Sequence, residues 1–286
     1  MQSLYDVPAP AKLNLFLHIT GRRADGYHLM QSVFMLIDWQ DCLHFERLTG
    51  SEISRQDLNP DAPELPNDDL CVRAAKALQK ATGCTQGVRI GIDKHIPSQA
   101  GMGGGSSDAA STLIALNRLW NLGLKRSQLT HIALGLGADV PFFVQGHNAW
   151  VEGIGELITP LTGAAQLPPQ DFWVVKPEAG LNTQSIFTAP NLTRNSKRAT
   201  IEDFAADHYG FGHNDLQPVA EALCSDVMQT KLWLNTQNLH ATMTGSGSAV
   251  FAQACKEIDF PNAPSNWKIR ICENLAIHPL KEWVAD

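Results

Sequence analysis

The chain has 286 residues, of which 44% are hydrophobic and 18% are charged. This length and apolar content supply a core for one large domain or two smaller ones and exclude disorder as the main state. The 22 basic and 29 acidic residues give a formal net charge of −7. Nucleic acids and anionic membranes require a basic face, so neither is expected as a partner. A small anionic ligand held by backbone amides stays compatible with this charge.

Cysteine usage and the N-terminal sequence indicate the compartment. The six cysteines stand at positions 42, 71, 84, 224, 255 and 272, without a Cys-x-x-Cys pair or a histidine spaced to complete a zinc site. We therefore predict reduced, buried thiols. The N-terminal residues show neither a secretory signal nor a transit-peptide pattern, and no run reaches the ~18 apolar residues of a membrane span. A soluble cytoplasmic protein is expected.

The first predicted elements form a β-hairpin. In residues 11–20 the odd positions are apolar and the even positions include Lys12 and Asn14, an alternation that predicts a strand buried on one face. Turn residues at 24–26 and an apolar run at 29–37 complete the hairpin. Two further strands are predicted at residues 43–48 and 88–92.

Residues 51–69 carry six acidic residues against one arginine, a net charge of −5, together with three prolines. They show neither helical nor strand periodicity, so we predict a solvated loop. Helices are then predicted in three segments, residues 70–80, 107–120 and 128–136. Pro141 is expected to end the last of them.

The second half of the chain follows a proline-bounded, uncharged stretch at residues 160–170, which is typical of a domain boundary. We predict two domains, residues 1–165 and 166–286. Strands are predicted at residues 172–175, 239–244, 249–254 and 268–272, and helices at residues 183–188, 215–223 and 226–234. Strands interleaved with helices, without regular βαβ alternation, indicate an α+β fold with mostly antiparallel sheets.

The densest chemical signal is the sequence Pro-Ser-Gln-Ala-Gly-Met-Gly-Gly-Gly-Ser-Ser-Asp, which begins at Pro97 between a predicted strand and a predicted helix. Four glycines in five positions are costly in conformational entropy. Consecutive amides and the positive end of the following helix bind phosphate without net basic charge. The alternative is a flexible connection in which a serine or Asp108 caps the helix. The spacing matches neither a Walker ATPase nor a Rossmann dehydrogenase.

A second glycine turn, Thr-Gly-Ser-Gly-Ser at residues 244–248, joins two predicted strands. Taken alone, such a sequence is most often a simple hairpin turn. Next to the first glycine loop it offers a second amide-rich concavity.

Asp139 is the one charged residue in the apolar stretch 133–144. Such a carboxylate is paired, caps a helix or is functional, because an unpaired buried charge is very costly. Lys12 and Asn14 share one face of the first strand, which is otherwise an ordinary solvated face. A lysine and an aspartate beside a phosphate-binding loop suit phosphoryl transfer, in which one orients or deprotonates a hydroxyl and the other offsets negative charge.

Aromatic residues supply a further candidate site. Tyr27 and His28 follow the hairpin turn, and Phe187 lies in the second half of the chain. Rings beside turns usually serve packing, whereas two rings from different halves can also sandwich a base. His208 and His213 lack metal-ligand spacing and are predicted to be surface residues.

Three segments, residues 9–17, 97–110 and 243–251, resemble the motifs of the GHMP kinase superfamily in sequence, order and separation. The Gly-Arg-Arg-Ala-Asp-Gly-Tyr-His element after the first strand resembles the branch of that superfamily that acts on a cytidine-diphospho polyol. This element is unusual among mevalonate, homoserine or galactose kinases. The resemblance extends over nearly the whole chain and is strongest in the first 150 residues.

The resemblance implies an α+β, two-domain GHMP kinase fold, with a ribosomal-protein-S5-like domain, a ferredoxin-like domain and the active site in the cleft between them. It implies transfer of the ATP γ-phosphoryl group to the tertiary 2-hydroxyl of 4-diphosphocytidyl-2-C-methyl-D-erythritol, with Mg²⁺, in the non-mevalonate (methylerythritol phosphate) route to isoprenoid precursors. The alternatives are a GHMP kinase acting on mevalonate or homoserine, and a non-catalytic nucleotide-binding protein on the same scaffold.

By the same resemblance, Lys12 and Asp139 match the catalytic pair. The substrate-binding residues are matched by Asn14, Tyr27, His28, Thr183 and Phe187, with the two aromatic rings around cytosine and His28 hydrogen-bonding it. The ATP-binding residues are matched by Lys94, Pro97, Ser98, Gln99, Ala100, Gly101, Met102, Gly103, Gly104, Gly105, Ser106, Ser107 and Asp108. Ser107 is also a candidate Mg²⁺ ligand.

The chain departs from the family pattern at two positions. Met102 stands where leucine is common, a change that conserves volume. Asp69 stands where asparagine is usual, so an amide donor expected to contact adenine is lost. We also expect Lys12 and Lys94 to make the cleft locally basic.

Overall fold

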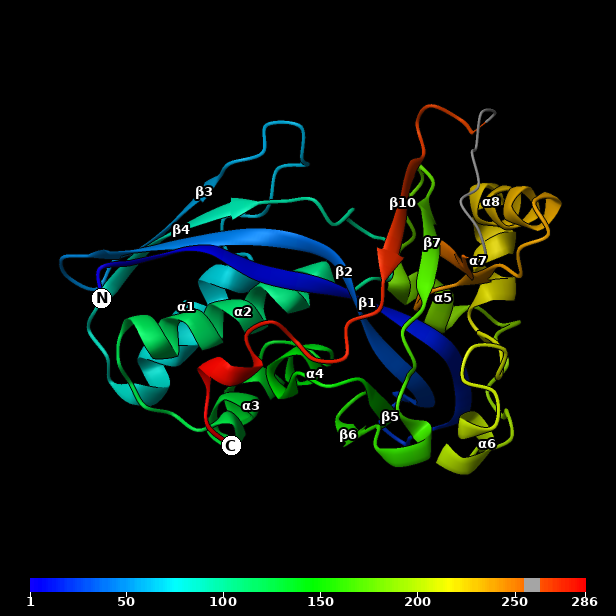
Figure 1. The fold of residues 1–286 in the computed structure, drawn as a ribbon, viewed down its shortest axis with the longest axis horizontal. Coiled ribbons are helices and arrows are strands. Elements are labelled where there is room, and N and C mark those ends of the chain that lie inside the picture. Colours follow the sequence, from blue (N-terminus) through cyan, green and yellow to red (C-terminus); the bar gives the residue numbers. More distant parts are fainter. Residues whose placement is uncertain (255–262) are drawn as a thin grey trace.

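Two very long strands organise the structure, a computed structural model that describes residues 1–254 and 263–286. Strands β1 (Ser3–Arg22) and β2 (His28–Leu48) pair antiparallel from Ser3–Glu46 to Arg22–His28, which confirms the predicted hairpin. They run from a helical lobe on one side of the molecule to the second sheet on the other, where they curve downwards (Figure 1).

β1 and β2 belong to a six-stranded sheet that also contains β3 (Ile53–Asp57), β4 (Gly87–Asp93), β5 (Ala149–Gly153) and β6 (Leu157–Pro160). The order is β3-β4-β2-β5-β6, with β1 paired to β2. Only the β3–β4 pair is parallel among the described strand pairs of this sheet.

The prediction that residues 51–69 form a loop is wrong for residues 53–57, which form β3. This strand pairs in parallel with β4, from Ile53–Val88 to Asp57–Ile92. Its residues are half-buried or exposed, as expected for a polar strand at a sheet edge. β3 is held by backbone hydrogen bonds to β4, which do not depend on side-chain type, so this short polar segment shows no periodic pattern from which a strand could be predicted.

The predicted burial of β1 on one face only is also wrong. On the even-numbered face, Lys12, Asn14 and Phe16 are 3%, 1% and 0% exposed. The Phe16 ring packs edge-on against Phe211, with centroids 5.1 Å apart, and lies 5.3 Å from the Trp150 ring. Segments far away in the sequence therefore cover the face that the alternation assigned to solvent.

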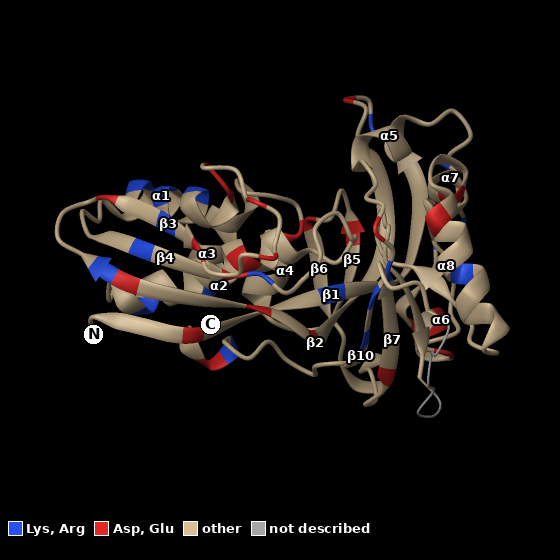
Figure 2. Cartoon of the chain, turned by 90° about the horizontal axis from the view of Figure 1, so that it is seen from above, with Lys and Arg blue, Asp and Glu red and all other residues tan. Residues whose placement is uncertain are grey.

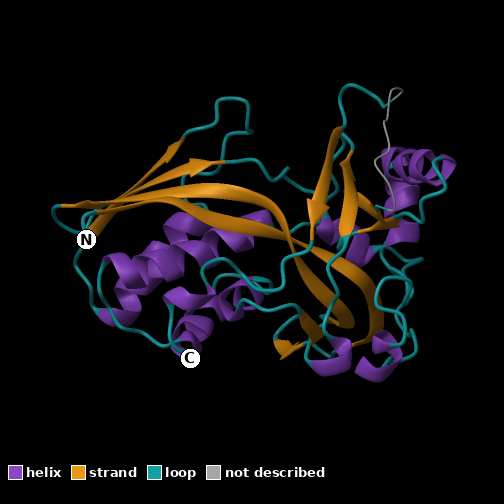
Figure 3. Ribbon diagram, in the orientation of Figure 1, coloured by secondary structure: helices purple, strands orange, loops and turns teal. Residues whose placement is uncertain are grey.

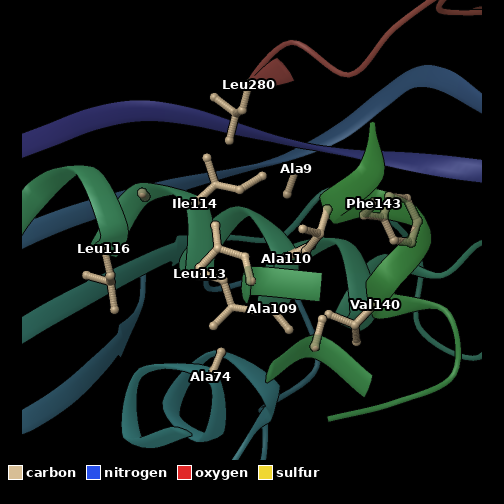
Figure 4. Close-up of a cluster of buried hydrophobic side chains, with 14 of the residues drawn as sticks. Ala9, Ala74, Ala109, Ala110, Leu113, Ile114, Leu116, Val140, Phe143 and Leu280 are labelled. Carbon is tan, nitrogen blue, oxygen red and sulfur yellow. The ribbon is translucent and has the colours of Figure 1, made fainter. Parts of the chain in front are cut away.

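Four helices cover one side of this sheet and form with it the first lobe (Figure 3). They are α1 (Leu70–Thr82), α2 (Gly104–Leu119), α3 (Arg126–Leu134) and α4 (Val140–Gln145). α2 is central, and its Ala109, Ala110 and Leu113 are fully buried beneath Ala9 of β1 (Figure 4). Pro141 does not end the preceding helix but stands in the first turn of α4, where its missing N–H breaks no helical hydrogen bond.

The second lobe contains a four-stranded antiparallel sheet in the order β10-β7-β9-β8. Its strands are β7 (Asp171–Lys176), β8 (Thr242–Met243), β9 (Val250–Gln253) and β10 (Lys268–Glu273). The helices of this half are α5 (Thr183–Thr188), α6 (Ile201–Ala205), α7 (Gln217–Leu223) and α8 (Ser225–Thr236). The expected helix at 183–188 is confirmed, α6 was not predicted, and β8 is shorter than the predicted strand at 239–244.

The linker predicted at residues 160–170 contains the end of β6 and a short 3₁₀ helix, η1 (Gly163–Ala165). The last residues of the chain, including the 3₁₀ helix η2 (Lys281–Trp283), return to the first lobe. There Leu280 packs into its core, on the side of Ile114 (Figure 4). A division of the chain at residue 165 stays a prediction.

Arg126 anchors the C-terminal segment to the first lobe through hydrogen bonds. The side chain is 7% exposed, and its Nη1 and Nη2 donate to the carbonyls of Val144 at 2.8 Å and Val284 at 2.7 Å. Nη2 also donates to the Lys281 carbonyl, and Nε pairs with Asp286.

We expect Arg126→Met to lower the free energy of unfolding by about 3 kcal/mol, because three carbonyls lose their donor at roughly 1 kcal/mol each. Thermal and urea unfolding measure this loss. Asp286→Asn is the control, since it removes only the partner that is 76% exposed, and it should cost less than about 1 kcal/mol. If both variants lost the same free energy of unfolding, the hydrogen bonds from Arg126 to the three carbonyls would not explain the effect of Arg126→Met.

The described cysteines are all free. Cys71 and Cys272 are buried, as predicted, but Cys42, Cys84 and Cys224 are half-buried. Cys255 lies outside the described residues. Over residues 1–254 and 263–286, no helix combines the length and apolar character that crossing a bilayer requires.

Candidate active site

A cavity of about 740 Å³ is lined by the glycine loop before α2, by the second glycine turn and by α5. All of the predicted site residues line it except Tyr27, His28 and Ser107. Residues more than 200 positions apart in the sequence thus line one cavity, as with Lys12 and Ser246. The cavity is the candidate site.

The two glycine turns are packed against each other. Gly101 has φ +73°, and a Cβ at this position would lie 2.2 Å from the Thr244 carbonyl oxygen and 2.8 Å from the Gly247 nitrogen. The Ser248 and Ala249 amides donate to the Gln99 and Ala100 carbonyls at 3.1 and 3.2 Å. The turn at 244–248 links β8 to β9, as predicted, and it also forms the support of the first loop.

The first turn of α2 faces the cavity without a side-chain cap. Gly103 occupies the N-cap with φ 72°, and it makes no capping bond from a side chain. The alternative in which a serine or Asp108 caps this helix is therefore wrong. Gly103, Gly104 and Gly105 all line the cavity, so the positive end of a sixteen-residue helix is directed at it.

Lys12 lies at the centre of a buried polar network. Its Nζ donates to the Asn14 side chain and, at 3.0 Å, to the Gly101 carbonyl, and it lies 3.7 Å from Asp139 Oδ2. It also stands 4.7 Å above the centre of the Phe34 ring. Burial lowers the pKa of Lys12, and the Asp139 carboxylate opposes this effect. The solvated strand face, given above as the ordinary reading of Lys12 and Asn14, is wrong.

Asp139 immediately precedes α4, yet its side chain caps no amide of that helix. Its side chain is 29% exposed and borders the cavity. Of the three readings of this residue, the ion pair with Lys12 is present and the helix cap is absent, while the functional role stays a prediction. A partly exposed carboxylate beside a buried ammonium is a group that a ligand hydroxyl can reach.

Asn14 extends the network away from the cavity. Its Nδ2 donates to Ser32 Oγ at 2.9 Å, and its backbone N–H donates to Thr244 Oγ1 at 2.8 Å. The amide oxygen, which accepts from Lys12, is thereby fixed in orientation. Neither Ser32 nor Thr244 was predicted as a site residue, because their polar side chains carry no distinctive spacing.

Lys94 is held by two buried carboxylates. Its Nζ lies 2.7 Å from Asp108 Oδ2 and also bonds Asp41 Oδ2, while Asp41 Oδ1 accepts from the His95 and Ile96 amides at 2.6 and 2.8 Å. Burial lowers the pKa of Lys94, but Asp108 and Asp41 outweigh it and raise the pKa overall. Sequence analysis missed Asp41, which is 53 residues from its partner.

The prediction of a locally basic cleft is wrong. Lys12 faces Asp139, and Lys94 faces two carboxylates, so both lysines are already matched. Figure 2 shows acidic and basic segments side by side around α2 and α4 rather than a patch of one sign. An anion in the cavity therefore meets the amides of the glycine loop, the helix end and the exposed Arg73 rather than an unpaired lysine.

Burial raises the pKa of Asp108 to about 8, with Asp41 adding to the effect and Lys94 opposing it. A carboxyl whose folded pKa exceeds its unfolded value stabilises the fold at low pH, and this contribution is lost as pH rises. We expect the wild type to lose stability relative to Asp108→Asn between about pH 4 and pH 8. Melting temperatures of both proteins across that range test this, and a constant difference would contradict it.

Comparison with known proteins places this site in a family. The sequence model of the GHMP kinases N terminal domain matches residues 69–147. The chain is 68% identical to 4-diphosphocytidyl-2-C-methyl-D-erythritol kinase of Delftia acidovorans, over 100% of this chain and 99% of that protein. The chain belongs to the 4-diphosphocytidyl-2-C-methyl-D-erythritol kinase family.

The solved structures agree with this membership. A crystal structure of 4-(cytidine 5'-diphospho)-2C-methyl-D-erythritol kinase superposes with a TM-score of 0.77 at 30% identity, covering 95% of this chain and 98% of that one. A homoserine kinase from Cytophaga hutchinsonii gives 0.67 at 13% identity, covering 97% and 96%, a likeness of fold alone. The expected two-domain α+β GHMP kinase fold is confirmed, and the chain is a small-molecule kinase with ATP as phosphate donor.

With the family known, the aromatic residues can be located. His28 and Phe187 lie together, with ring centroids 5.3 Å apart and planes inclined by 35°. Tyr27 is 62% exposed and has no ring contact with either of them. The structure thus brings Phe187 of α5 next to His28, the predicted hydrogen-bonding group, while the predicted pair of enclosing rings, Tyr27 and Phe187, is not in contact.

The remaining predicted residues are held in different ways. Thr183 Oγ1 lies 2.8 Å from Ser246 Oγ and so joins α5 to the second glycine turn. Asp69 caps α1 by accepting from the Val72 amide at 2.9 Å, and it also pairs with Arg55. Among the two predicted surface histidines, His213 is exposed and His208 is half-buried.

The cavity also offers oxygen ligands to a divalent cation. The carboxylate of Asp139 is accessible, and Asp108 has a buried oxygen, Oδ1, without a hydrogen-bond partner. Such oxygens fit Mg²⁺, which in kinases is bound by one or two carboxylates together with substrate phosphates. Ser107 instead donates its hydroxyl proton to the Pro10 carbonyl at 2.7 Å and does not line the cavity.

A separate group, Asp6, Cys42 and His44, places three ligand atoms within 4.8 Å of one another, away from the cavity. These groups already bond among themselves, since the Asp6 amide donates to His44 Nδ1 at 3.1 Å and the Cys42 thiol lies 3.8 Å from Asp6 Oδ1. Burial and the nearby carboxylates raise the pKa of the Cys42 thiol to about 11, which disfavours the thiolate that a metal needs.

Proposed function

We propose that the protein transfers the γ-phosphoryl group of ATP to the 2-hydroxyl of 4-diphosphocytidyl-2-C-methyl-D-erythritol, giving the 2-phosphate and ADP. The observation that carries this proposal is the Lys12–Asp139 pair, 3.7 Å apart at the wall of the cavity that the glycine loop also lines. The names of the full-length relatives supply the acceptor.

The two charged groups divide the chemistry. The Asp139 carboxylate accepts a hydrogen bond from the 2-hydroxyl and thereby orients it towards the phosphorus atom. The Lys12 ammonium offsets the negative charge on the transferred group. Because phosphoryl transfer passes through a loose transition state, positioning by these groups contributes more than complete removal of the proton.

ATP binds along the glycine loop in this proposal. The amide N–H groups at the start of α2 donate hydrogen bonds to its phosphates, and Lys94, fixed by Asp41 and Asp108, lines the same cavity. The carboxylates of Asp139 and Asp108 are the groups that would hold a Mg²⁺ ion here, and such an ion would supply positive charge against the nucleotide phosphates. The proposed substrate contacts are made by Asn14, Thr183, His28, Phe187 and Tyr27.

We further propose a cytoplasmic location and small-molecule partners, with no binding of nucleic acid or membranes. The net charge of −7 supports the absence of both polyanionic partners. We also retain the division into an N-terminal domain, residues 1–165, and a C-terminal domain, residues 166–286.

Phosphorus NMR of the reaction products tests the reaction itself. Incubation with ATP, Mg²⁺ and the cytidine-diphospho substrate is expected to give a new phosphomonoester signal, equal in amount to the ADP formed. The diphosphate signals of the substrate should persist. Release of inorganic phosphate in place of the phosphomonoester would contradict the proposal.

A further inference from the structure

Arg194 connects two parts of the molecule that are far apart in the sequence. Its Nε donates to His28 Nε2 at 3.1 Å, which links the segment after α5 to the β1–β2 hairpin. Its Nη2 donates to the carbonyls of Phe187 at 3.3 Å and Ala189 at 2.6 Å, at the C-terminal end of α5. Its Nη1 donates to the Leu192 carbonyl at 3.0 Å.

This guanidinium has no carboxylate partner among the described residues. Its hydrogen bonds go to carbonyl oxygens and to one imidazole nitrogen. Arg198, four residues later, offers a contrast, because it forms an exposed surface ion pair with Glu152. The planar Arg194 guanidinium donates to four acceptors at once, so it fixes the positions of these acceptors relative to one another better than a flexible surface ion pair would.

The bond to His28 determines the state of the imidazole. A guanidinium only donates hydrogen bonds, so His28 Nε2 must accept and carries no proton. The neutral ring then has its proton on Nδ1 and presents that N–H as a donor. Burial lowers the pKa of His28, with the Arg194 and Arg22 charges adding to the effect, so the ring stays neutral.

We propose that Arg194 is a positioning residue for base recognition, which fixes His28 as the Nδ1–H tautomer and holds it beside Phe187. The inference rests on the proposed function, since it concerns how the cytosine base is selected. Phe187 and His28 are 159 residues apart in the sequence, and Arg194 bonds to both of their segments. The ring pair is therefore formed before substrate arrives.

A fixed Nδ1–H donor suits cytosine better than uracil. Cytosine presents acceptors at N3 and O2, whereas uracil carries a hydrogen on N3. A donor directed at N3 therefore pairs with cytosine and opposes uracil, and a site built on such a bond rejects the wrong partner by leaving polar groups unpaired. Free rotation and tautomer exchange of His28 would weaken this discrimination.

Nitrogen NMR of the imidazole in the free protein gives the direct test. In the wild type, His28 is expected to show a protonated Nδ1 and an unprotonated Nε2. In Arg194→Met the signals should move towards the Nε2–H tautomer. Arg198→Met is the matched control and should leave the wild-type pattern unchanged. A wild-type His28 protonated on Nε2, or an unchanged pattern in Arg194→Met, would overturn the inference.

Kinetics separate positioning from general stability. Arg194→Met is expected to raise KM for the cytidine substrate about tenfold, the loss of one well-oriented hydrogen bond, while kcat and KM for ATP change less than about threefold. A tenfold fall in kcat with an unchanged KM for the cytidine substrate would contradict a role of Arg194 in positioning the base-binding residue. If this variant does not fold, Arg194→Lys keeps the charge without the fork and should show the same direction of change. Absence of turnover by the wild type would overturn the proposed function. The NMR experiment does not need turnover, so it would still show whether Arg194 fixes the tautomer of His28.

Discussion

Asp139→Asn is expected to lower kcat by about 10²–10⁴-fold, the usual contribution of a group that orients or deprotonates the attacking hydroxyl. The amide keeps the shape of the side chain but supplies no negative charge. Lys12 loses the carboxylate that opposes the effect of burial, so the pKa of the lysine falls further. Steady-state ADP release, measured at saturating ATP and substrate, tests the expectation.

Two controls give this experiment its meaning. Cooperative thermal unfolding of Asp139→Asn should be retained, since the side chain is 29% exposed and caps no helix. Asp171→Asn makes the same chemical change at an exposed site at the start of β7, and its kcat should equal that of the wild type. Normal turnover by Asp139→Asn would remove this residue from the proposed mechanism.

Gly101→Ala is expected to lower the free energy of unfolding by about 2–5 kcal/mol, the sum of a left-handed backbone and an overpacked contact. At φ +73° an added Cβ would lie 2.2 Å from the Thr244 carbonyl oxygen. The turn at 244–248 would have to move away, and the Thr244 bond to the Asn14 amide would be strained. Urea unfolding measures the stability, and ATP affinity should fall with it.

Gly105→Ala is the matched control for this substitution. Gly105 lies in α2, and a Cβ there would make an ordinary contact of 3.5 Å with Leu70. The alanine should change stability by less than about 1 kcal/mol, because it also favours the helix. If both alanines cost the same, the packing of the two glycine turns would not explain the glycine at 101.

Patterns within a single segment predicted the fold well. The helix predicted at residues 183–188 is present as α5, and the alternation of residues 11–20 correctly predicted a strand. The same alternation failed to predict burial of the even face, because Phe211 and Trp150, which cover Phe16, are remote in sequence. Residues 51–69 failed for a related reason, since β3 exists through its pairing with β4.

The candidate site shows the same limit more clearly. Lys12, Asp139 and the glycine loop have local signals, namely a lysine in an apolar strand, a lone charge and a glycine cluster. Asp41 and Arg194 have none, because each acts through a partner 53 or 166 residues away. Their importance comes from burial and from the number of bonds that each makes, which only the folded chain shows.

The electrostatic prediction failed because it counted lysines without their partners. Lys94 lies between Asp41 and Asp108, so its positive charge is fully matched inside the protein. In the proposed function, the negative charge of the ATP phosphates would then be balanced mainly by backbone amides and by a bound Mg²⁺ ion. Binding of ATP should accordingly weaken steeply when Mg²⁺ is removed.

One panel assay tests the central claim most directly. ADP formation from ATP and Mg²⁺ is measured with 4-diphosphocytidyl-2-C-methyl-D-erythritol, mevalonate or homoserine as the acceptor. We expect turnover with the cytidine-diphospho acceptor and at least about 10³-fold lower kcat/KM with the other two, which have no base for His28 and Phe187 to bind. Comparable turnover of mevalonate or homoserine, or tight ATP binding without turnover of any acceptor, would contradict the account.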